Sequence, residues 1–160
     1  MDILIRKAIL NDYEELCLIY KEIDELHRLN HPELFIEAND YSRAKEYISE
    51  IINDDSKALF VAETESKIVG FAECLILKSS SFPVIKKREW LQLDNIAVKR
   101  DYQNQNIGTM LFNIIIKWGR DQGINRIELK VYSFNTNAIS FYKKNGFKDL
   151  NRTMYLNLES

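Results

Sequence analysis

The stretch WLQLDNIAVKRDYQNQNIGTMLFNIIIKW, from Trp90 to Trp118, carries the strongest structural signal in the chain. Its first part, Trp90–Val98, predicts a β-strand, and an Asn-rich polar loop follows directly. The remainder is an amphipathic helix, because its apolar residues recur at helical spacing. That stripe consists of Ile107, Met110, Leu111, Ile114, Ile115 and Trp118.

The apolar alternation inside this strand changes register part-way along. Leu91 and Leu93 share one face, whereas Ile96 and Val98 would fall on the other face of a regular strand. A strand that keeps one face buried must therefore gain or lose a residue between these pairs. The sequence predicts a β-bulge near Asp94–Asn95.

Periodicity in the rest of the chain predicts alternating helices and strands around one central sheet, which is a mixed α/β fold. The expected order is strand, two helices, three strands, helix, strand, helix, strand. Besides the stretch above, the elements are a strand at Ile3–Ile5, a helix over Asn11–Leu29 with Asn11 or Asp12 as N-cap and Pro32 beyond its end, a helix over Tyr41–Ile52, strands at Leu59–Ala62 and Ile68–Leu77, a strand at Ile127–Val131, a helix over Asn135–Lys144, and a last strand from Phe147.

Length and composition bound the class of protein. The 160 residues suit one domain spanning 1–160, and the 22 basic and 24 acidic residues give a net charge of −2. This balance argues against a nucleic-acid partner, and no apolar run is long enough to cross a membrane. The start lacks the features of a signal peptide, and Cys17 and Cys74 form no CxxC motif. A cytoplasmic protein with two buried, unpaired cysteines is expected.

The loop before the helical stripe, Gln103–Thr109, is the first candidate for chemistry. The first amides of a helix have no intrahelical partner and carry partial positive charge, so a tight turn into that end suits a phosphate. Gly108 would let a ligand approach the backbone closely. The same residues could form an ordinary helix start, and a nucleotide is an alternative phosphate ligand.

A second stretch, Asn135–Phe147, completes a pattern that resembles the Gcn5-related N-acetyltransferase (GNAT) family. The family's loop Gln/Arg-x-x-Gly-x-Gly/Ala corresponds to Gln103–Gly108, with Asn106 in place of the first Gly. Asn is the non-Gly residue that best tolerates a positive φ, so the loop can keep its shape. The family's motif Asn-x-x-Ala-x-x-x-Tyr-x-x-x-Gly-Phe is matched by Asn135, Ala138, Tyr142, Gly146 and Phe147.

The resemblance implies the GNAT-like fold, a central and mostly antiparallel sheet with a V-shaped splay, flanked by about four helices. It also implies acetyl-CoA as the acetyl donor, with its pantetheine arm along the strand and its pyrophosphate on the loop. Arg100, Lys143 and Lys144 could meet its outer phosphates or be solvated surface charges. The implied cofactor-binding residues are Ile96, Ala97, Val98, Gln103, Asn104, Gln105, Asn106, Ile107, Gly108, Thr109, Asn135 and Tyr142.

For catalysis the resemblance implies that an amine attacks the thioester directly and that Tyr142 protonates the leaving thiolate. Asp94 at the bulge and Glu73 on the preceding strand are candidates for the general base, and a water relay is a third alternative. A backbone amide near Ile96 or Ala97 could hold the developing negative charge on the thioester oxygen.

The expected function is N-acetyl transfer to a primary amine, on a small molecule or a peptide N-terminus. A catalytically weak acyl-CoA sensor on the same fold is the alternative, and a homodimer is left open. No metal is expected, because Pro32 spoils the helical pairing of His27 with His31. The acceptor pocket is expected near the end of the first helix and the 79–88 loop, where Tyr20, Glu22, Glu25 and Phe35 suit a cationic amine.

Overall fold

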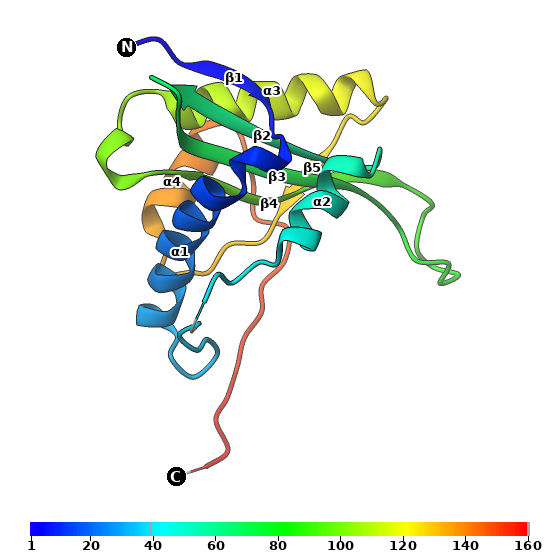
Figure 1. The fold of residues 1–160 in the computed structure, drawn as a ribbon. Helices are drawn as coiled ribbons and strands as arrows, with labels where there is room; N and C mark the ends of the chain where they lie inside the picture. The colour runs from blue at the N-terminus through cyan, green and yellow to red at the C-terminus, as the bar shows by residue number, and fades with distance from the viewer. Residues whose placement is uncertain (39, 160) are drawn as a thin grey trace. The chain divides into compact units, whose positions relative to one another are not determined.

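The computed structural model describes residues 1–38 and 40–159, which form two compact units (Figure 1). The first unit, Met1–Lys130, contains the sheet and three α-helices, and the second unit, Val131–Ser160, contains the fourth α-helix. The expectation of one domain over 1–160 stays a prediction.

The first unit is built on a five-stranded sheet in the order β1-β2-β3-β4-β5. The first four strands pair antiparallel with their neighbours, and β5 runs parallel to β4. Glu65 and Ser66 connect β2 to β3 with φ of 49° and 62°, the left-handed turn whose twist suits a tight hairpin. The bounds are β1 Leu4–Lys7, β2 Lys57–Thr64, β3 Lys67–Lys78, β4 Glu89–Val98 and β5 Ile127–Leu129.

Three helices cover the two faces of this sheet: α1 (Tyr13–Asn30), α2 (Lys45–Asn53) and α3 (Ile107–Asp121). On β3, the ring of Phe71 lies 4.5 Å from the ring of Tyr20 on α1. Its neighbour Gly70 faces α3, since a Cβ added there would lie 3.2 Å from Leu111 Cδ1. Successive strand residues point to opposite faces, so α1 and α3 lie on opposite sides of the sheet.

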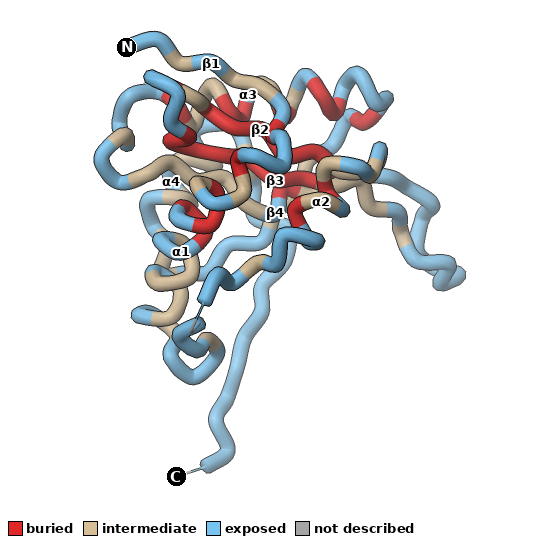
Figure 2. The backbone as a smooth tube through the Cα atoms, in the orientation of Figure 1, coloured by how far each residue is buried: buried red, intermediate tan, exposed pale blue. Residues whose placement is uncertain are grey.

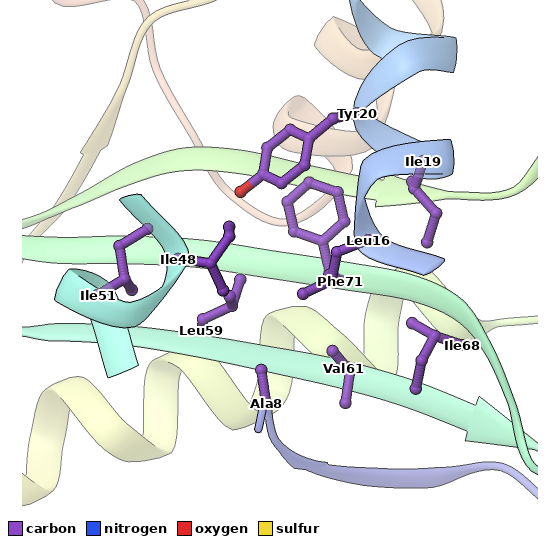
Figure 3. Packing of buried hydrophobic residues seen from close by; sticks show 10 residues of the cluster. All are labelled: Ala8, Leu16, Ile19, Tyr20, Ile48, Ile51, Leu59, Val61, Ile68 and Phe71. Carbon is purple, nitrogen blue, oxygen red and sulfur yellow. The ribbon is translucent and has the colours of Figure 1, made fainter. Parts of the chain in front are cut away.

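Burial is concentrated where these layers meet, along the central strands and the inner sides of the helices (Figure 2). One apolar cluster joins α1 and α2 to β2 and β3, and Figure 3 shows the Tyr20 ring beside Phe71 within it. Its buried members are Ala8, Leu16, Ile19, Tyr20, Ile48, Ile51, Leu59, Val61, Ile68 and Phe71.

The start of α1 confirms the expected cap position at Asp12. A 3-10 turn over Leu10–Asp12 precedes the helix, and the Asp12 carboxylate accepts hydrogen bonds from Arg6 Nη1 and Nη2 and from the Ile9 amide. Burial alone would raise the pKa of this carboxyl, but the Arg6 guanidinium outweighs it and lowers the pKa. The helix ends at Asn30, before Pro32, as predicted.

The prediction for the second helix is wrong at its start, because α2 begins at Lys45 rather than Tyr41. The Tyr13 hydroxyl donates to the Arg43 carbonyl at 2.6 Å, and Arg43 Nη1 reaches Asp24. Ala44 is extended, with φ −70° and ψ 154°. These tertiary contacts hold the preceding segment outside the helix.

The second unit contains α4 (Thr136–Lys144), close to the predicted Asn135–Lys144. Asn135 caps it by accepting from the Ala138 amide at 3.3 Å, and Gly146 follows with φ +92°.

The predicted last strand is absent, because residues 147–159 lie in neither strand nor helix. The strand predicted at Ile127–Val131 forms but ends at Leu129. An alternating pattern becomes a strand only where another strand satisfies its backbone groups.

Both cysteines are buried and free, as expected. Burial raises the pKa of Cys17, and it raises the pKa of Cys74 to about 12. In the part of the chain that the structure describes, no helix combines the length and apolar character needed to cross a bilayer.

The close approach at Gly70 gives a test of the packing between β3 and β4. A Cβ at this position would lie 2.9 Å from the Ala97 carbonyl oxygen, which is backbone and cannot rotate away. We expect Gly70→Ala to lower the free energy of unfolding by about 1–3 kcal/mol in urea titrations. Gly119→Ala is the control, because its Cβ would meet only the Leu91 side chain, at 3.2 Å. Equal stability of the two variants would contradict this account.

Candidate functional site

The β-bulge predicted in β4 is confirmed and sits at Asp94. Glu73 on β3 pairs with Asn95, while the next residue, Cys74, pairs with Leu93. Asp94 is therefore the extra residue on β4. This one-residue change in register places Leu91 and Leu93 on the same face of the sheet as Ile96 and Val98, as the sequence pattern predicted.

Beyond the bulge, β4 and β5 part. Their parallel pairing is recorded only from Leu91–Leu93 to Ile127–Leu129, although β4 continues to Val98. The Lys99 amide donates to Val69 O on β3 at 2.8 Å. The backbone groups of successive strand residues point to opposite edges of the strand, so Ala97 points toward β3 as Lys99 does. The N–H and C=O groups of Ile96 and Val98 therefore point to the other edge, where β4 and β5 diverge.

On the opening side, Gln103 Nε2 donates a hydrogen bond to the Val98 carbonyl oxygen at 3.1 Å. The backbone N–H groups of Ile96 and Val98 and the Ile96 carbonyl are thus presented on an edge that β5 does not cover. Such an edge can pair with an extended ligand as if a strand were added.

The loop from β4 into α3 has the positive φ at Asn106 that the sequence predicted. Asn104 and Asn106 adopt φ of 60° and 68°, so the expected positive φ at Asn106 is confirmed. Asn106 is the N-cap of α3, but its side chain makes no capping hydrogen bond. No acidic residue lies in the first helical turn. The first amides of α3 therefore keep their partial positive charge for an anion.

A buried carboxylate lies beside the bulge. Glu73 is 3% exposed and accepts hydrogen bonds from the Tyr20 hydroxyl and from Asn95 Nδ2, both at 2.9 Å, and from the Tyr47 hydroxyl. These donors come from α1, β4 and α2. Burial and the charge on Glu73 raise the pKa of Tyr20 and of Tyr47, so both phenols stay protonated.

Asp94 lies next to Glu73 but keeps its access to solvent. Partial burial, and after it the negative charge of Glu73, raises the pKa of Asp94, while Lys130 and Lys57 oppose the shift. The two candidate bases therefore differ in environment. Glu73 is buried and accepts three hydrogen bonds, whereas Asp94 is exposed to solvent and has a raised pKa.

An open hollow of about 380 Å³ adjoins Asp94 on the same face of the sheet as Glu73. Trp90 and the paired Leu75 and Leu77 supply apolar surface, and Glu128 adds a second carboxylate. Arg88 stacks 4.0 Å over the Trp90 ring and also reaches Glu128 at 2.6 Å. The lining residues are Leu75, Leu77, Trp90, Gln92, Leu93, Asp94, Glu128 and Lys130.

None of the four residues expected at the acceptor pocket, Tyr20, Glu22, Glu25 and Phe35, lines this hollow. Tyr20 lies in the buried core, and its hydroxyl donates a hydrogen bond to Glu73. Glu25 pairs with Arg28, and Glu22 accepts a hydrogen bond from the Arg100 amide. The ring of Phe35 lies 5.6 Å from that of His27, and His31 Nδ1 contacts Glu33.

Sequence reasoning missed Tyr47 and Asn95 as partners of Glu73 and missed Trp90 and Glu128 at the hollow. Tyr47 lies on the helix whose start was misplaced, and its contact with β3 spans 26 positions. The alternation of Trp90, Gln92 and Asp94 along the strand was the one signal that could have grouped the lining residues.

In the second unit, Tyr142 lies within a cluster of aromatic rings. Its ring is 5.7 Å from Phe141 and 5.5 Å from Phe147. Burial raises the pKa of Tyr142 to about 12, which keeps the hydroxyl protonated at neutral pH. Lys143, Lys144 and, in the first unit, Arg100 are exposed.

Comparison with known proteins adds to this geometry. Residues 20–147 match the profile described as "Acetyltransferase (GNAT) family". The spermidine N(1)-acetyltransferase of Thermoplasma acidophilum is 32% identical over 155 residues, 92% of this chain and 89% of that protein. Other curated N-acetyltransferases are 35% and 30% identical over 106 and 94 residues, and the chain spans only 46% and 40% of their length.

Solved structures share the fold. A mutant of the BH1408 protein from Bacillus halodurans has a TM-score of 0.92 at 25% identity, covering 98% of this chain and 99% of that one. The aminoglycoside N-acetyltransferase AAC(6')-Iy in complex with CoA has a TM-score of 0.74 at 16% identity, covering 99% and 96%. The GNAT-like fold inferred from the sequence is therefore confirmed.

The left-handed geometry at Asn106 predicts how substitutions there affect stability. A β-branched side chain is strained at φ 68°, whereas glycine is not. We expect Asn106→Val to lower the free energy of unfolding by about 1–3 kcal/mol and Asn106→Gly to change it little, measured by urea unfolding. Gln105→Val at the neighbouring position is the control, since Gln105 has no positive φ. Similar losses at both positions would refute a specific backbone demand at Asn106.

Proposed function

The chain belongs to the Acetyltransferase (GNAT) family, and from that premise we propose that it moves an acetyl group from acetyl-CoA to a primary amine in a ternary complex. One observation carries the proposal: the bulge at Asp94 adjoins a β4 edge that β5 leaves uncovered, just before the uncapped start of α3. Such an arrangement suits a ligand with an extended amide-containing arm and a phosphate group.

The β4 edge and the loop before α3 fit acetyl-CoA, which when bound supplies the thioester that is attacked. The amides of Asn104–Thr109 would hold the pyrophosphate, since the side chain of the N-cap residue Asn106 does not bond to them. The backbone of Ile96 and Val98 would pair with the pantetheine arm. The backbone amides of Ile96 and Ala97 are the two candidates for holding the thioester oxygen. The Lys99 amide bonds to β3, and every second strand residue points the same way, so the Ala97 amide also points toward β3. We therefore favour the Ile96 amide.

Asp94 is the better candidate for the general base. Glu73 already accepts three hydrogen bonds in a buried position, so a proton placed there would disrupt them. Asp94 is open to an incoming amine, and its raised pKa brings it closer to the pH at which it must work. Its carboxylate would take the proton that the attacking nitrogen loses, directly or through one water.

Tyr142 is proposed as the general acid, a role carried over from the family's second motif. Its phenol stays protonated at neutral pH, because burial raises its pKa to about 12. It would donate that proton to the leaving thiolate as the carbon–sulfur bond breaks.

A small-molecule amine is the favoured acceptor. Asp94 places a carboxylate at the hollow, between apolar walls that include Trp90, while the charge of Glu128 is already compensated by Arg88 and Arg126. This surface suits a cationic amine carrying a short apolar chain, and the relative from Thermoplasma acidophilum is named for such a substrate, spermidine. A peptide N-terminus is the other acceptor class to be tested.

The direct test is release of CoA thiol from acetyl-CoA in the presence of a panel of diamines, polyamines, amino sugars and short peptides. Saturable, amine-dependent release supports the proposal. Tight CoA binding without release for every amine would support the acyl-CoA sensor instead. Binding of ATP with displacement of CoA would support a nucleotide ligand.

The raised pKa of Asp94 predicts the pH profile of the reaction. Since the base must be ionised, kcat/KM should rise with pH through the Asp94 pKa and then level off. Glu73→Gln removes the nearby negative charge, which lowers the Asp94 pKa and moves this rise to lower pH. Tyr20→Phe is the control, because it removes a hydrogen bond to Glu73 but leaves its charge. An unchanged profile in Glu73→Gln, with the activity retained, would argue against Asp94 as the base.

Removing the Tyr142 hydroxyl tests the general acid. Tyr142→Phe keeps the ring contacts with Phe141 and Phe147, so CoA affinity and folding should survive. We expect kcat to fall about 10²–10⁴-fold, and an acyl donor with a more acidic thiol to recover part of it. Tyr132→Phe is the matched control from the same unit. A kcat within about twofold of the unmodified protein, with chemistry rate-limiting, would refute the role.

A further inference from the structure

The hollow beside Asp94 is lined by side chains of both charges. Glu128 is neutralised there, because Arg88 lies 2.6 Å and Arg126 lies 2.7 Å from its carboxylate. Lys130 and Asp94 also line the hollow, and among the residues that the structure describes neither of them forms an ion pair. The hollow therefore offers a ligand one carboxylate and one ammonium group that no direct contact neutralises.

These two groups flank the point where the sheet opens. Leu93 on β4 and Leu129 on β5 form the last recorded pair, so Asp94 and Lys130 are the next residues on the two strands. Paired strands lie about 4.8 Å apart, and β4 and β5 diverge beyond this pair. The ammonium group of Lys130 opposes the rise in the Asp94 pKa, which shows that the two charges are near each other although they are not in contact.

Much of the remaining lining is apolar. Leu75 and Leu77 on β3 supply aliphatic surface, and the Trp90 ring is held by Arg88, which stacks 4.0 Å over it. The volume of about 380 Å³ is near the lower end of the range for small-molecule sites. The hollow therefore suits a compact ligand that has an apolar side chain and carries both charges at one end.

We propose that the acceptor is a free α-amino acid with an apolar side chain, bound with its amino group at Asp94 and its carboxylate at Lys130. This inference rests on the proposed acetyl transfer and narrows its acceptor to one class. A simple amine would satisfy Asp94 but leave the Lys130 ammonium group unpaired, whereas an amino acid satisfies both. A peptide N-terminus lacks the carboxylate next to its amino group and has the same defect.

The chemistry of this acceptor is the transfer already described. The neutral amino nitrogen forms a bond to the acetyl carbon as the carbon–sulfur bond breaks, and Asp94 takes the proton that the nitrogen loses. The thiolate leaves and is protonated, so the products are an N-acetylamino acid and CoA. Lys130 binds the carboxylate and takes no part in the proton transfers.

The test compares amino acids with the amines that lack their carboxylate: L-leucine with 3-methylbutylamine, and L-phenylalanine with 2-phenylethylamine. Release of CoA thiol gives kcat/KM for each, and we expect the amino acid to be the better substrate of each pair. Lys130→Met should lower the ratio of the two kcat/KM values about tenfold or more. Lys130→Arg should largely preserve the ratio, because it keeps the charge.

The ratio is the right measure because Lys130 also affects the Asp94 pKa, and both substrates of a pair depend on Asp94 equally. Lys117→Met is the matched control. Lys117 lies on α3, on the other side of the sheet, and pairs with Asp121 at 2.8 Å. Circular dichroism checks that the variants fold, which the exposed position of Lys130 allows.

Calorimetric titration of L-leucine into the CoA-bound protein judges the inference without turnover. Binding that Lys130→Met weakens and Lys117→Met does not supports it, even if no acceptor releases thiol and the proposed acetyl transfer fails. An absence of binding, or equal binding to the two variants, overturns it. A kcat/KM ratio that Lys130→Met leaves unchanged overturns it as well, while thiol release with simple amines would leave the proposed acetyl transfer standing.

Discussion

Burying one carboxylate in the middle of the sheet constrains most of what surrounds it. Glu73 can stay in that position only if neighbouring groups donate hydrogen bonds to it, because an unpaired buried charge is costly. The donors come from α1, α2 and β4, so one side chain fixes both helices against the bulged strand. The hollow beside Asp94 borders this network, and its shape therefore depends on a group that the proposed reaction need not touch.

Much of the fold and part of the site could be predicted from local sequence patterns. The bulge at Asp94 followed from a break in alternation, and the geometry at Asn106 followed from its place before an apolar helix. Both depend on backbone sterics and pleating, which act over a few residues. The α3 stripe was recognisable for the same reason.

What could not be predicted depends on contacts between distant parts of the chain. Tyr20 has the spacing of a core residue on a helix, and nothing local reveals that its hydroxyl meets Glu73, 53 positions away. The start of α2 was misplaced because Arg43 is held by residues of α1. The segment after Phe147 has the pattern of a strand, but a pattern does not specify which edge completes it.

The two buried thiols, Cys17 and Cys74, make it possible to follow local and global unfolding by their rates of alkylation. Only thiolates react quickly with alkylating reagents, and Cys74, with a pKa of about 12, is masked by both its proton and its burial. Cys74 lies on the central strand β3, so its modification requires the sheet to come apart. Cys17 lies on α1 and needs only that helix to detach. The ratio of their labelling rates would therefore separate peeling of one helix from global unfolding, without any introduced probe.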